Sequence, residues 1–353
     1  MKITLKAEDL DGYLTPTDRE YLARTEALYG EVQACFAALA GASSKAETAQ
    51  AEATLITRYN AMGAFIQDVC RQENALHVYP FMTPVENHGE ASRLIAKLRD
   101  TRTQHGEFVY YIQRAYELLF NLAYAGRSSV DRHYLIVKTP VTAPAQNYAV
   151  HKIPNIDGQI ENSVMCVMLR GALLPAMIMS KEIQEYSAHN YITPFALFKI
   201  SRDDSKEEHN MEYILDLDKS YFNREALNDK DLIFADPMNA TGGSIVTIVN
   251  YLRREGVKPR SIKFFNVLAA LKGALRSIRA LENCQVFTLW MDPLLNKAAY
   301  IMPGLGDAGD RINGHDPAEH PRNIMQLIAD YGANIAQLYR SQLREIERTV
   351  LTP

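Results

Sequence analysis

The most distinctive chemical feature of the sequence is the stretch DPMNATGGS at residues 236–244, which combines a carboxylate, two hydroxyls and two adjacent glycines. It follows the apolar run 232–235 and precedes the apolar run 245–249, so a strand is expected to give way to a helix here. A loop rich in Gly, Ser and Thr at a helix N-terminus presents unpaired amides and the positive end of the helix dipole, which favours phosphate binding. A purely structural turn would use the same residue types, so this stretch alone does not decide between the two.

Neither common nucleotide-binding pattern is present in this stretch. The lysine of GxxxxGK[ST] is missing, and no GxGxxG opens a βαβ unit. Asp236 stands at the expected strand end, about where a ribose hydroxyl would lie if a phosphate occupied the loop. A phosphorylated sugar therefore fits the stretch better than a nucleoside triphosphate.

A second candidate is YIMPGLGDAGDR at residues 300–311, which has three glycines, one proline and two aspartates and shows no helical or strand period. The backbone amides and carbonyls of such a segment can approach a ligand closely. Considered alone, it would more readily be a structural loop than a binding loop.

Together, the two stretches resemble the uracil phosphoribosyltransferases. In that family a DPMxATGGS loop binds the 5-phosphate of phosphoribosyl pyrophosphate (PRPP), and a YI-x-PGLGDAGDR segment closes over uracil. Shorter similarities to the family's LRD, ILRAG and YRDEE motifs occur at residues 98–100, 168–172 and 202–203. The resemblance covers about residues 76–314, so a helical extension at 1–75 and a second extension at 315–353 are expected on either side.

The resemblance implies one group of residues at PRPP and one at uracil. The positions expected at PRPP are Arg170, Arg202, Asp236, Pro237, Met238, Asn239, Ala240, Thr241, Gly242, Gly243, Ser244 and Asp307. The positions expected at uracil, which would act through backbone groups, are Ile301, Gly306, Asp307 and Ala308. Asp236, Arg170 and Asp307 are the expected catalytic residues.

The implied reaction converts uracil and PRPP to UMP and pyrophosphate. Residues 240–244 would hold the 5-phosphate, Asp236 the ribose hydroxyls, and Arg170 and Arg202 the pyrophosphate, because guanidinium groups stay charged and pair well with phosphate oxygens. No protein nucleophile is needed, and Mg²⁺ would be held chiefly by PRPP and water rather than by protein ligands. Backbone donors that face a uracil carbonyl would face the amino group of cytosine, a mismatch that can cost roughly 10⁴ in specificity.

The sequence departs from the family's motifs at four places. Asn239 replaces a usual aliphatic residue, and the order Gly171-Ala172 reverses the family's Ala-Gly after the arginine. Ser201 replaces a usual tyrosine, and Lys272 stands in LAALKG where AAPEG is common. These changes leave two alternatives open: a phosphoribosyltransferase for another base, and a non-catalytic regulator that binds uracil, a nucleotide or RNA. Val in place of Gly242 is expected to fill the position of the anion and to weaken PRPP use with little loss of fold.

Residues 1–75 are predicted to form a helical hairpin. Residues 17–20 and 44–47 fit the capping box, in which a hydroxyl and a carboxylate satisfy opposite amides at a helix start. Each segment then carries its apolar residues on one helical face: Leu28, Val32, Cys35, Phe36 and Leu39 in the first, and Leu55, Tyr59, Met62, Phe65, Ile66 and Val69 in the second. Because the pair cannot bury both stripes alone, the hairpin must pack on the rest of the chain or on a second copy.

The remainder of the chain predicts an α/β fold. Helices are expected at 90–99, 106–125, 245–254 and 272–281, and strands at 164–169, 195–200, 213–215, 232–235, 263–268 and 286–290. Apolar strands that alternate with helices are typical of a mainly parallel sheet flanked by helices, and such sheets bind ligands at the carboxyl ends of their strands. The resemblance specifies a type I phosphoribosyltransferase-like fold. The charged segment 203–210 is interpreted as a solvated hairpin tip, with a mobile flap as the alternative.

After Pro321 the sequence predicts a long amphipathic C-terminal helix. Its apolar stripe, from Ile324 to Ile346, is expected to pack with the N-terminal hairpin or across a homo-oligomer interface. The two extensions are therefore expected to set the oligomeric state together.

The overall composition narrows the class of protein. A net charge of −4 and a pI near 6.2 provide no basic surface for nucleic acid, and no apolar run reaches the roughly 18 residues of a membrane span. The N-terminus lacks the apolar block of a signal peptide, so a cytoplasmic protein is expected. The four cysteines and nine histidines show no zinc or disulfide spacing, and a surface role is expected for His315 and His320.

Overall fold

The computed structural model describes residues 1–82, 85–125, 131–314, 322–327, 329 and 340–351. Its core is an eight-stranded sheet in the order β1-β7-β6-β5-β8-β10-β12-β2. The central pairs are parallel, while β7 is antiparallel to both β6 and β1. The strands are β1 (Lys2–Lys6), β2 (Leu76–Val78), β5 (Ser163–Leu169), β6 (Phe195–Arg202), β7 (Glu212–Tyr221), β8 (Asp231–Ala235), β10 (Ser261–Asn266) and β12 (Cys284–Thr288).

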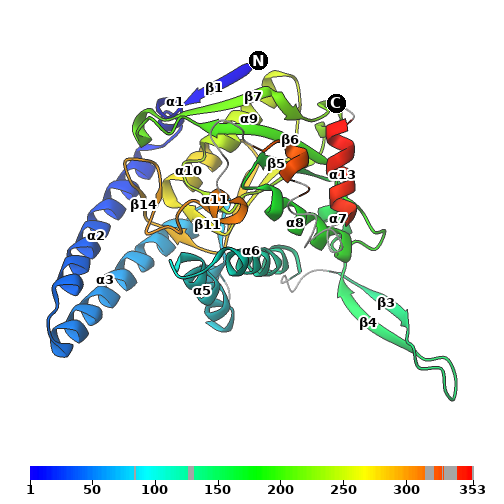
Figure 1. Ribbon diagram of the computed structural model, residues 1–353, viewed down its shortest axis with the longest axis horizontal. Helices are drawn as coiled ribbons and strands as arrows, with labels where there is room; N and C mark the ends of the chain where they lie inside the picture. Colours follow the sequence, from blue (N-terminus) through cyan, green and yellow to red (C-terminus); the bar gives the residue numbers. More distant parts are fainter. Residues whose placement is uncertain (83–84, 126–130, 315–321, 328, 330–339, 352–353) are drawn as a thin grey trace.

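Helices cover both faces of this sheet, so the predicted α/β class with a mainly parallel sheet is confirmed (Figure 1). On one face, α9 (Gly243–Arg254) contacts β1, β6 and β7 and packs beside α10 (Leu271–Ala280). On the other, α8 (Leu173–Tyr186) packs between β5 and α6 (His105–Phe120), which continues as a π-helical turn, η1 (Asn121–Ala125). Every residue of β5 and β8 is buried, which explains their continuous apolar sequences.

The chain reverses its direction across the sheet between β5 and β8. The connection through α8 leads from β5 to β6 on one side, and the connections through α9 and α10 lead from β8 to β10 and β12 on the other. Such a reversal opens a crevice beyond the carboxyl ends of the two neighbouring strands, where α/β proteins bind their ligands. A small parallel sheet extends this end of the fold, formed by β9 (Met238–Asn239), β11 (Leu268–Ala270) and β13 (Met291–Asp292).

The N-terminal hairpin is formed by α2 (Pro16–Gly41) and α3 (Lys45–Arg71), which extend together away from the sheet (Figure 1). The second predicted capping box is confirmed, because Ser44 and Glu47 cap α3. The first was placed two residues late: Thr15 and Asp18 cap α2, and Pro16 occupies its first turn, a position that favours proline. The prediction also missed β1 and the short α1 (Ala7–Asp11) ahead of the hairpin.

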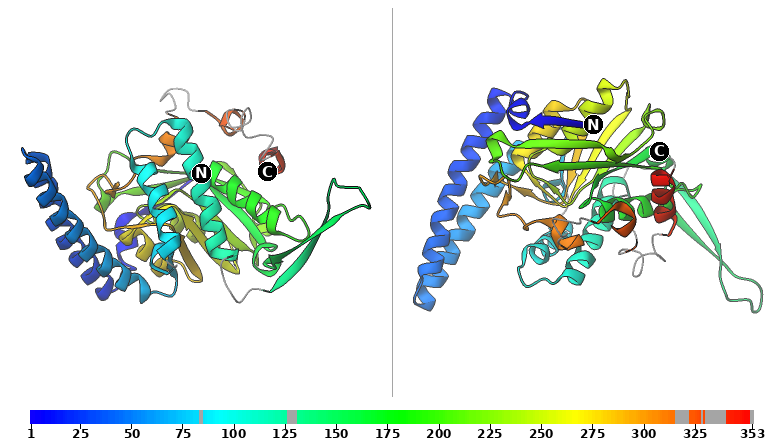
Figure 2. Two further views of the ribbon diagram at one scale, coloured as in Figure 1. Left: turned by 90° about the horizontal axis from the view of Figure 1, so that it is seen from below. Right: turned by 45° about the horizontal axis from the view of Figure 1, so that its top comes forward.

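The position of the C-terminal helix differs from the prediction. The C-terminal helix α13 (Arg340–Leu351) contacts β6 and α8, and Thr349 Oγ1 donates a hydrogen bond to the Phe195 carbonyl at 3.2 Å. It lies across the body from the α2–α3 hairpin (Figures 1 and 2), so the expectation that the two extensions pack together in one chain is wrong for this helix. The intervening apolar positions 328, 331, 335 and 338, and His315 and His320, lie outside the described residues.

The remaining described elements connect these layers. A β-ribbon of β3 (Arg132–Lys138) and β4 (Tyr148–Pro154) projects from the body on the side opposite the helical hairpin (Figure 2). The other elements are α4 (Tyr79–Met82), α5 (Val85–Arg99), α7 (Asp157–Ile160), η2 (Glu208–Asn210), η3 (Glu225–Leu227), β14 (Leu294–Leu295), β15 (Ile301–Met302) and α11 (Ala308–Asn313). No helix within the described ranges combines the length and apolar character of a bilayer span.

Candidate functional site

A pocket of about 180 Å³ opens at the carboxyl end of β8, in the crevice beside β5. It brings together the two sequence candidates, which lie some sixty residues apart in the chain. The predicted site residues that line it are Arg202, Asp236, Met238, Asn239, Ala240, Thr241, Gly242, Gly243, Ser244, Ile301 and Asp307. Four others, Arg170, Pro237, Gly306 and Ala308, do not belong to this lining.

The loop 240–244 runs directly into the N-terminus of α9. Gly242 is the N-cap residue, with φ of 74°, and the hydroxyl oxygen of Thr241 accepts a hydrogen bond from the Gly243 amide at 3.3 Å. An N-terminus of this kind directs amides and a positive partial charge toward one point, the property expected of an anion site. The strand-to-helix position predicted for this loop is confirmed.

Close packing around the loop gives a reason for the two adjacent glycines. A Cβ at Gly242 would lie 2.8 Å from the carbonyl oxygen of Gly273 and 2.9 Å from the Ser277 hydroxyl, both on α10. A Cβ at Gly243 would lie 2.2 Å from the ring of Tyr213. A side chain at Gly242 would therefore collide with α10, and one at Gly243 with the ring of Tyr213.

Asp236 follows β8 and lines the pocket, where it is partly buried. Burial raises the pKa of its carboxyl group to about 7, and the nearby charge of Asp307 acts in the same direction. One carboxylate oxygen accepts the Met238 amide at 3.0 Å, which partly opposes this shift. An acidic group that titrates near neutrality inside a pocket is a functional-site candidate, because structural carboxylates are usually paired with a cation.

The base-binding candidate segment reaches the pocket through β15 and the turn after it. Asp307 caps the short helix α11 by accepting the Asp310 amide at 2.9 Å. Gly304 and Gly306 have φ of 67° and 79°, a conformation that favours glycine. The buried carboxylate of Asp292 holds this turn, since it accepts the Gly304 amide at 3.0 Å and pairs with the Arg99 guanidinium at 2.6 Å.

The two predicted pyrophosphate-binding arginines occupy different positions. Arg202 lies on the pocket wall, where its guanidinium carbon is 4.8 Å from the centre of the Tyr300 ring and its Nε is 2.7 Å from Asp204. Arg170 instead contacts the base segment, with Nη2 2.5 Å from Asp310 Oδ1 and Nη1 2.7 Å from the Gly314 carbonyl oxygen. The altered motif order has a local basis, because a Cβ at Gly171 would lie 3.2 Å from Gly309 Cα.

Several pocket residues were not among the predicted site residues: Met168, Tyr213, Ile245, Phe264, Ala299 and Tyr300. Tyr213 is the most informative of them, because its buried side chain lies beside Thr241 of the loop 240–244. It lies on β7, which comes from the far side of β6, so no local motif marks it. The charged segment 203–210 before it is not a fully solvated tip, since Glu208 is largely buried and forms ion pairs with α10.

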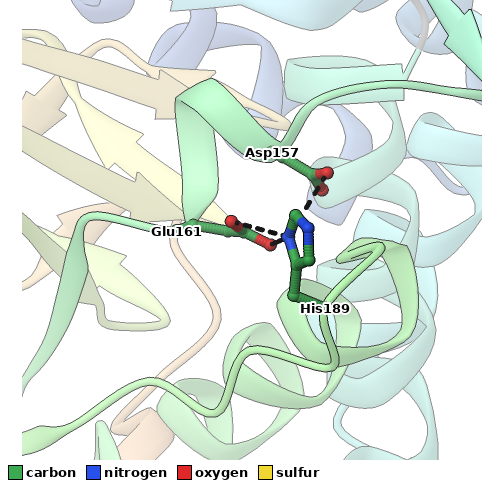
Figure 3. Close-up of side chains that lie close together, drawn as sticks. All are labelled: Asp157, Glu161 and His189. Carbon is green, nitrogen blue, oxygen red and sulfur yellow. Dashed lines mark hydrogen bonds and ion pairs between the residues drawn. The ribbon is translucent and has the colours of Figure 1, made fainter.

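One group in the described part of the chain has the composition of a metal site, Asp157, Glu161 and His189 (Figure 3). Hydrogen bonds within the protein explain why these three side chains lie together. The imidazole Nδ1 of His189 is 2.9 Å from a Glu161 oxygen, and Ser187 donates to the same carboxylate. The hydrogen bond with Glu161 raises the pKa of His189. Because β5 begins two residues after Glu161, the group lies at the opposite end of the sheet from the pocket and has no part in its chemistry.

The sequence of this chain is similar to those of known proteins from one family. Residues 85–314 match the family model described as uracil phosphoribosyltransferase. The uracil phosphoribosyltransferase of Mycoplasmoides gallisepticum is 30% identical over 65% of this chain and 96% of its own length. That of Campylobacter jejuni is 32% identical over 52% of this chain and 77% of its own. A shorter match, 46% identical, spans 23% of this chain but only 38% of the Campylobacter concisus protein.

Solved structures show more distant likenesses. The AQ2163 protein of Aquifex aeolicus is 19% identical, with a TM-score of 0.46 over 66% of this chain and 96% of that one. The orotate phosphoribosyltransferase of Mycobacterium tuberculosis in complex with PRPP is 13% identical, with a TM-score of 0.31 over 60% and 91% of the two chains. These likenesses are too weak to add to the family assignment, which depends on the sequence matches.

Proposed function

This chain belongs to the uracil phosphoribosyltransferase family and is a phosphoribosyltransferase, and from that premise we propose that it converts uracil and PRPP to UMP and pyrophosphate. One observation carries the proposal: a single pocket is lined both by the loop 240–244 and by Ile301 and Asp307 of the second candidate segment. A sugar phosphate and a flat base need two such binding regions side by side. In the cell the reaction would serve pyrimidine salvage.

The loop at the start of α9 would bind the 5-phosphate. Its amides and the N-terminus of the helix offer fixed donors that need no reorganisation when the anion arrives. Thr241 and Ser244 add hydroxyl donors, and both line the pocket. Tyr213, whose hydroxyl lies beside Thr241, lines the same wall and gives a further polar group beside the loop.

The two carboxyl groups would act on the ribose and around the departing pyrophosphate. Asp236, enclosed at the strand end, would bind the ribose hydroxyls and favour positive charge at the sugar as the bond to pyrophosphate breaks. Asp307 and the guanidinium of Arg202 line the pocket near it. The carboxylate oxygens of Asp236 and Asp307 are ligands of the kind that Mg²⁺ prefers. The ion itself would be held mainly by PRPP and water and would neutralise charge on pyrophosphate as it leaves.

Uracil would lie against the base segment and be recognised by main-chain groups. Ile301 lines the pocket, and the turn that follows is held by Asp292 and by the cap of Asp307 on α11. Gly306 and Ala308 would contribute their backbone groups from this turn, although neither residue belongs to the pocket lining. Arg170, which contacts Asp310, would position this segment as well as contribute charge beside the pyrophosphate.

A direct assay separates this proposal from its two alternatives. The purified protein is incubated with PRPP, Mg²⁺ and, in separate reactions, each nucleobase, and the products are identified by mass. We expect UMP from uracil and at least about 10³-fold less product from cytosine, because donors would then face donors. Product only with a different base would identify a related transferase, and ligand binding without product would identify a regulator.

We propose that the protein is a homo-oligomer and that its β-ribbon forms the contact. Tyr134, Ile136, Tyr148 and Val150 are each at least 60% exposed, and the strand register places all four on one face of the ribbon. A two-stranded ribbon is only marginally stable alone in water, and a contiguous exposed apolar face of this kind marks a candidate interface. A second copy of the chain could cover it symmetrically.

Charge substitution on the ribbon tests this contact. Ile136→Asp is expected to lower the mass in sedimentation equilibrium to that of one chain, because a carboxylate would be buried in the interface. The matched control is Ile56→Asp on α3, since Ile56 is 59% exposed and Ile136 is 64% exposed. Dissociation by the Ile56 variant alone would favour the helical hairpin as the interface.

We also propose a cytoplasmic location. All four cysteines are unpaired and buried, as is ordinary for proteins of a reducing compartment.

A further inference from the structure

Helix α10 forms the support directly behind the phosphate loop. A Cβ at Gly273 would lie 2.3 Å from the Ala240 carbonyl oxygen, so the helix and the loop are in closest contact there. The side-chain amide of Asn239 donates through Nδ2 to the Ser277 hydroxyl at 3.4 Å, and Arg276 Nη1 lies 3.5 Å from the Thr241 carbonyl oxygen. The conformation of the loop therefore depends on where α10 is held.

A buried ion network fixes this part of α10. Arg276 is fully buried, and its Nε and Nη2 lie 3.0 and 2.6 Å from one oxygen of Asp11, in α1. Its Nη1 lies 2.9 Å from Glu208 Oε1, in the segment between β6 and β7. The other oxygen of Glu208 is 2.8 Å from the ammonium group of Lys272. Lys272, one of the departures from the family motif, thus has an acidic partner in this chain.

A second cluster of ion pairs connects α10 to the N-terminal segment one helical turn further on. Arg279 Nε and Nη2 lie 3.0 and 2.9 Å from the two oxygens of Asp18, which is fully buried at the start of α2. Its Nη1 also lies 2.9 Å from Glu73, after the end of α3. Asp11, Asp18 and Glu73 all precede residues 85–314, the part of the chain that matches the family model.

We propose that the N-terminal segment braces the phosphate loop, and that Arg276 is the positioning residue through which Asp11 and Glu208 act. The two cations and two carboxylates of the first cluster balance in charge, so its effect on a phosphate is through geometry and not through a net positive field. Loss of either carboxylate would leave the buried guanidinium with only one of its two acidic partners, and the resulting desolvation cost would favour movement of Arg276 toward solvent. Movement of Arg276 would displace the Thr241 carbonyl and the amides that follow it.

Asp11→Asn and its control Asp18→Asn test the brace. Both variants break a buried ion pair between the N-terminal segment and α10, but only Asp11 is paired with the cation that contacts the loop. By calorimetry on the full chain, we expect Asp11→Asn to weaken Mg²⁺-PRPP binding about tenfold, with kcat and the KM for uracil little changed. Asp18→Asn should lower Tm with less than about a twofold change in PRPP affinity. Glu208→Gln, which approaches Arg276 from the other side, should reproduce the Asp11→Asn result.

Hydrogen exchange in the ligand-free protein provides a readout that does not depend on the proposed reaction. The amides of residues 239–243 should exchange faster in Asp11→Asn than in Asp18→Asn at equal margins below each Tm. Equal exchange and equal PRPP affinity in the two variants would overturn the brace. The PRPP result rests on the proposed function, so a wild-type protein that does not bind PRPP would contradict that function, while the exchange comparison would still decide the brace.

Discussion

Asp236→Asn is expected to lower the rate of UMP formation by about 10²- to 10³-fold and also to make the ligand-free protein more stable above neutral pH. The loss of activity follows from the proposed contact with the ribose, because asparagine cannot supply the negative charge that favours a positive sugar. The gain in stability follows from the burial of the same carboxyl group without a cation. Measurements of kcat and of Tm on the same preparation test both parts.

The contribution of Asp236 to the stability of the folded protein decreases as the pH rises. Burial raises the pKa of Asp236 to about 7 in the folded protein, while an unfolded aspartate titrates near 4. The folded state therefore binds the proton more tightly, and its stability falls as the pH rises from about 4 through 7. At pH 8 the charged carboxylate costs on the order of a few kcal/mol, which asparagine removes. The Tm difference between variant and wild type should thus be larger at pH 8 than at pH 5.

Asp231 provides the control, because it lies at the other end of the same strand. Burial alone would raise the pKa of Asp231, but hydrogen bonds from Arg260 and Ser261 outweigh burial and lower it. Asp231→Asn should therefore destabilise the protein at neutral pH. A Tm for Asp236→Asn below that of wild type at pH 8 would contradict the assignment of an unpaired, functionally retained carboxyl group.

Gly242→Ala is expected to raise the KM for PRPP about 100-fold, because a displacement of the loop by about 1 Å misplaces the phosphate. The added Cβ would meet the Gly273 carbonyl oxygen at 2.8 Å, inside a helix that cannot easily move, and φ of 74° adds strain of about 1–2 kcal/mol. Some loss of stability should accompany the loss of affinity. Gly242→Val should be more severe in both respects.

The matched control for this substitution is Gly256→Ala. Gly256 follows α9 with φ of 88°, and a Cβ there would meet no atom within 4 Å. It carries the same kind of backbone strain away from the pocket, so Tm should fall while the KM for PRPP stays unchanged. If both variants change KM equally, the effect belongs to general destabilisation and not to the loop.

Much of this site could be predicted from the sequence because its two loops are continuous motifs. The apolar runs of β5 and β8 marked a parallel sheet, and the loop after β8 then had to lie at its carboxyl edge. The missed β1 had a weak signal, since Ile3 and Leu5 alternate with polar residues at the period of a strand. The start of α2 was ambiguous because two overlapping segments fit the capping box, and Pro16 decided between them.

The remaining features depend on contacts between distant parts of the chain. Tyr213 reaches the pocket from a strand without a motif, and Arg276 pairs with Asp11, 265 residues away. Nothing in the local sequence at Gly242 or Gly243 reveals that α10 and a tyrosine ring stand behind them. Local patterns thus indicated where a ligand binds, but not what holds the binding loop in place.

The location of UMP in crystals of the wild-type protein tests the central claim most directly. The account predicts the phosphate oxygens within hydrogen-bonding distance of the backbone amides of residues 241–244, the ribose hydroxyls at Asp236, and the uracil ring against Ile301 and the turn after it. A nucleotide bound elsewhere, with the loop at the start of α9 free of phosphate, would contradict it.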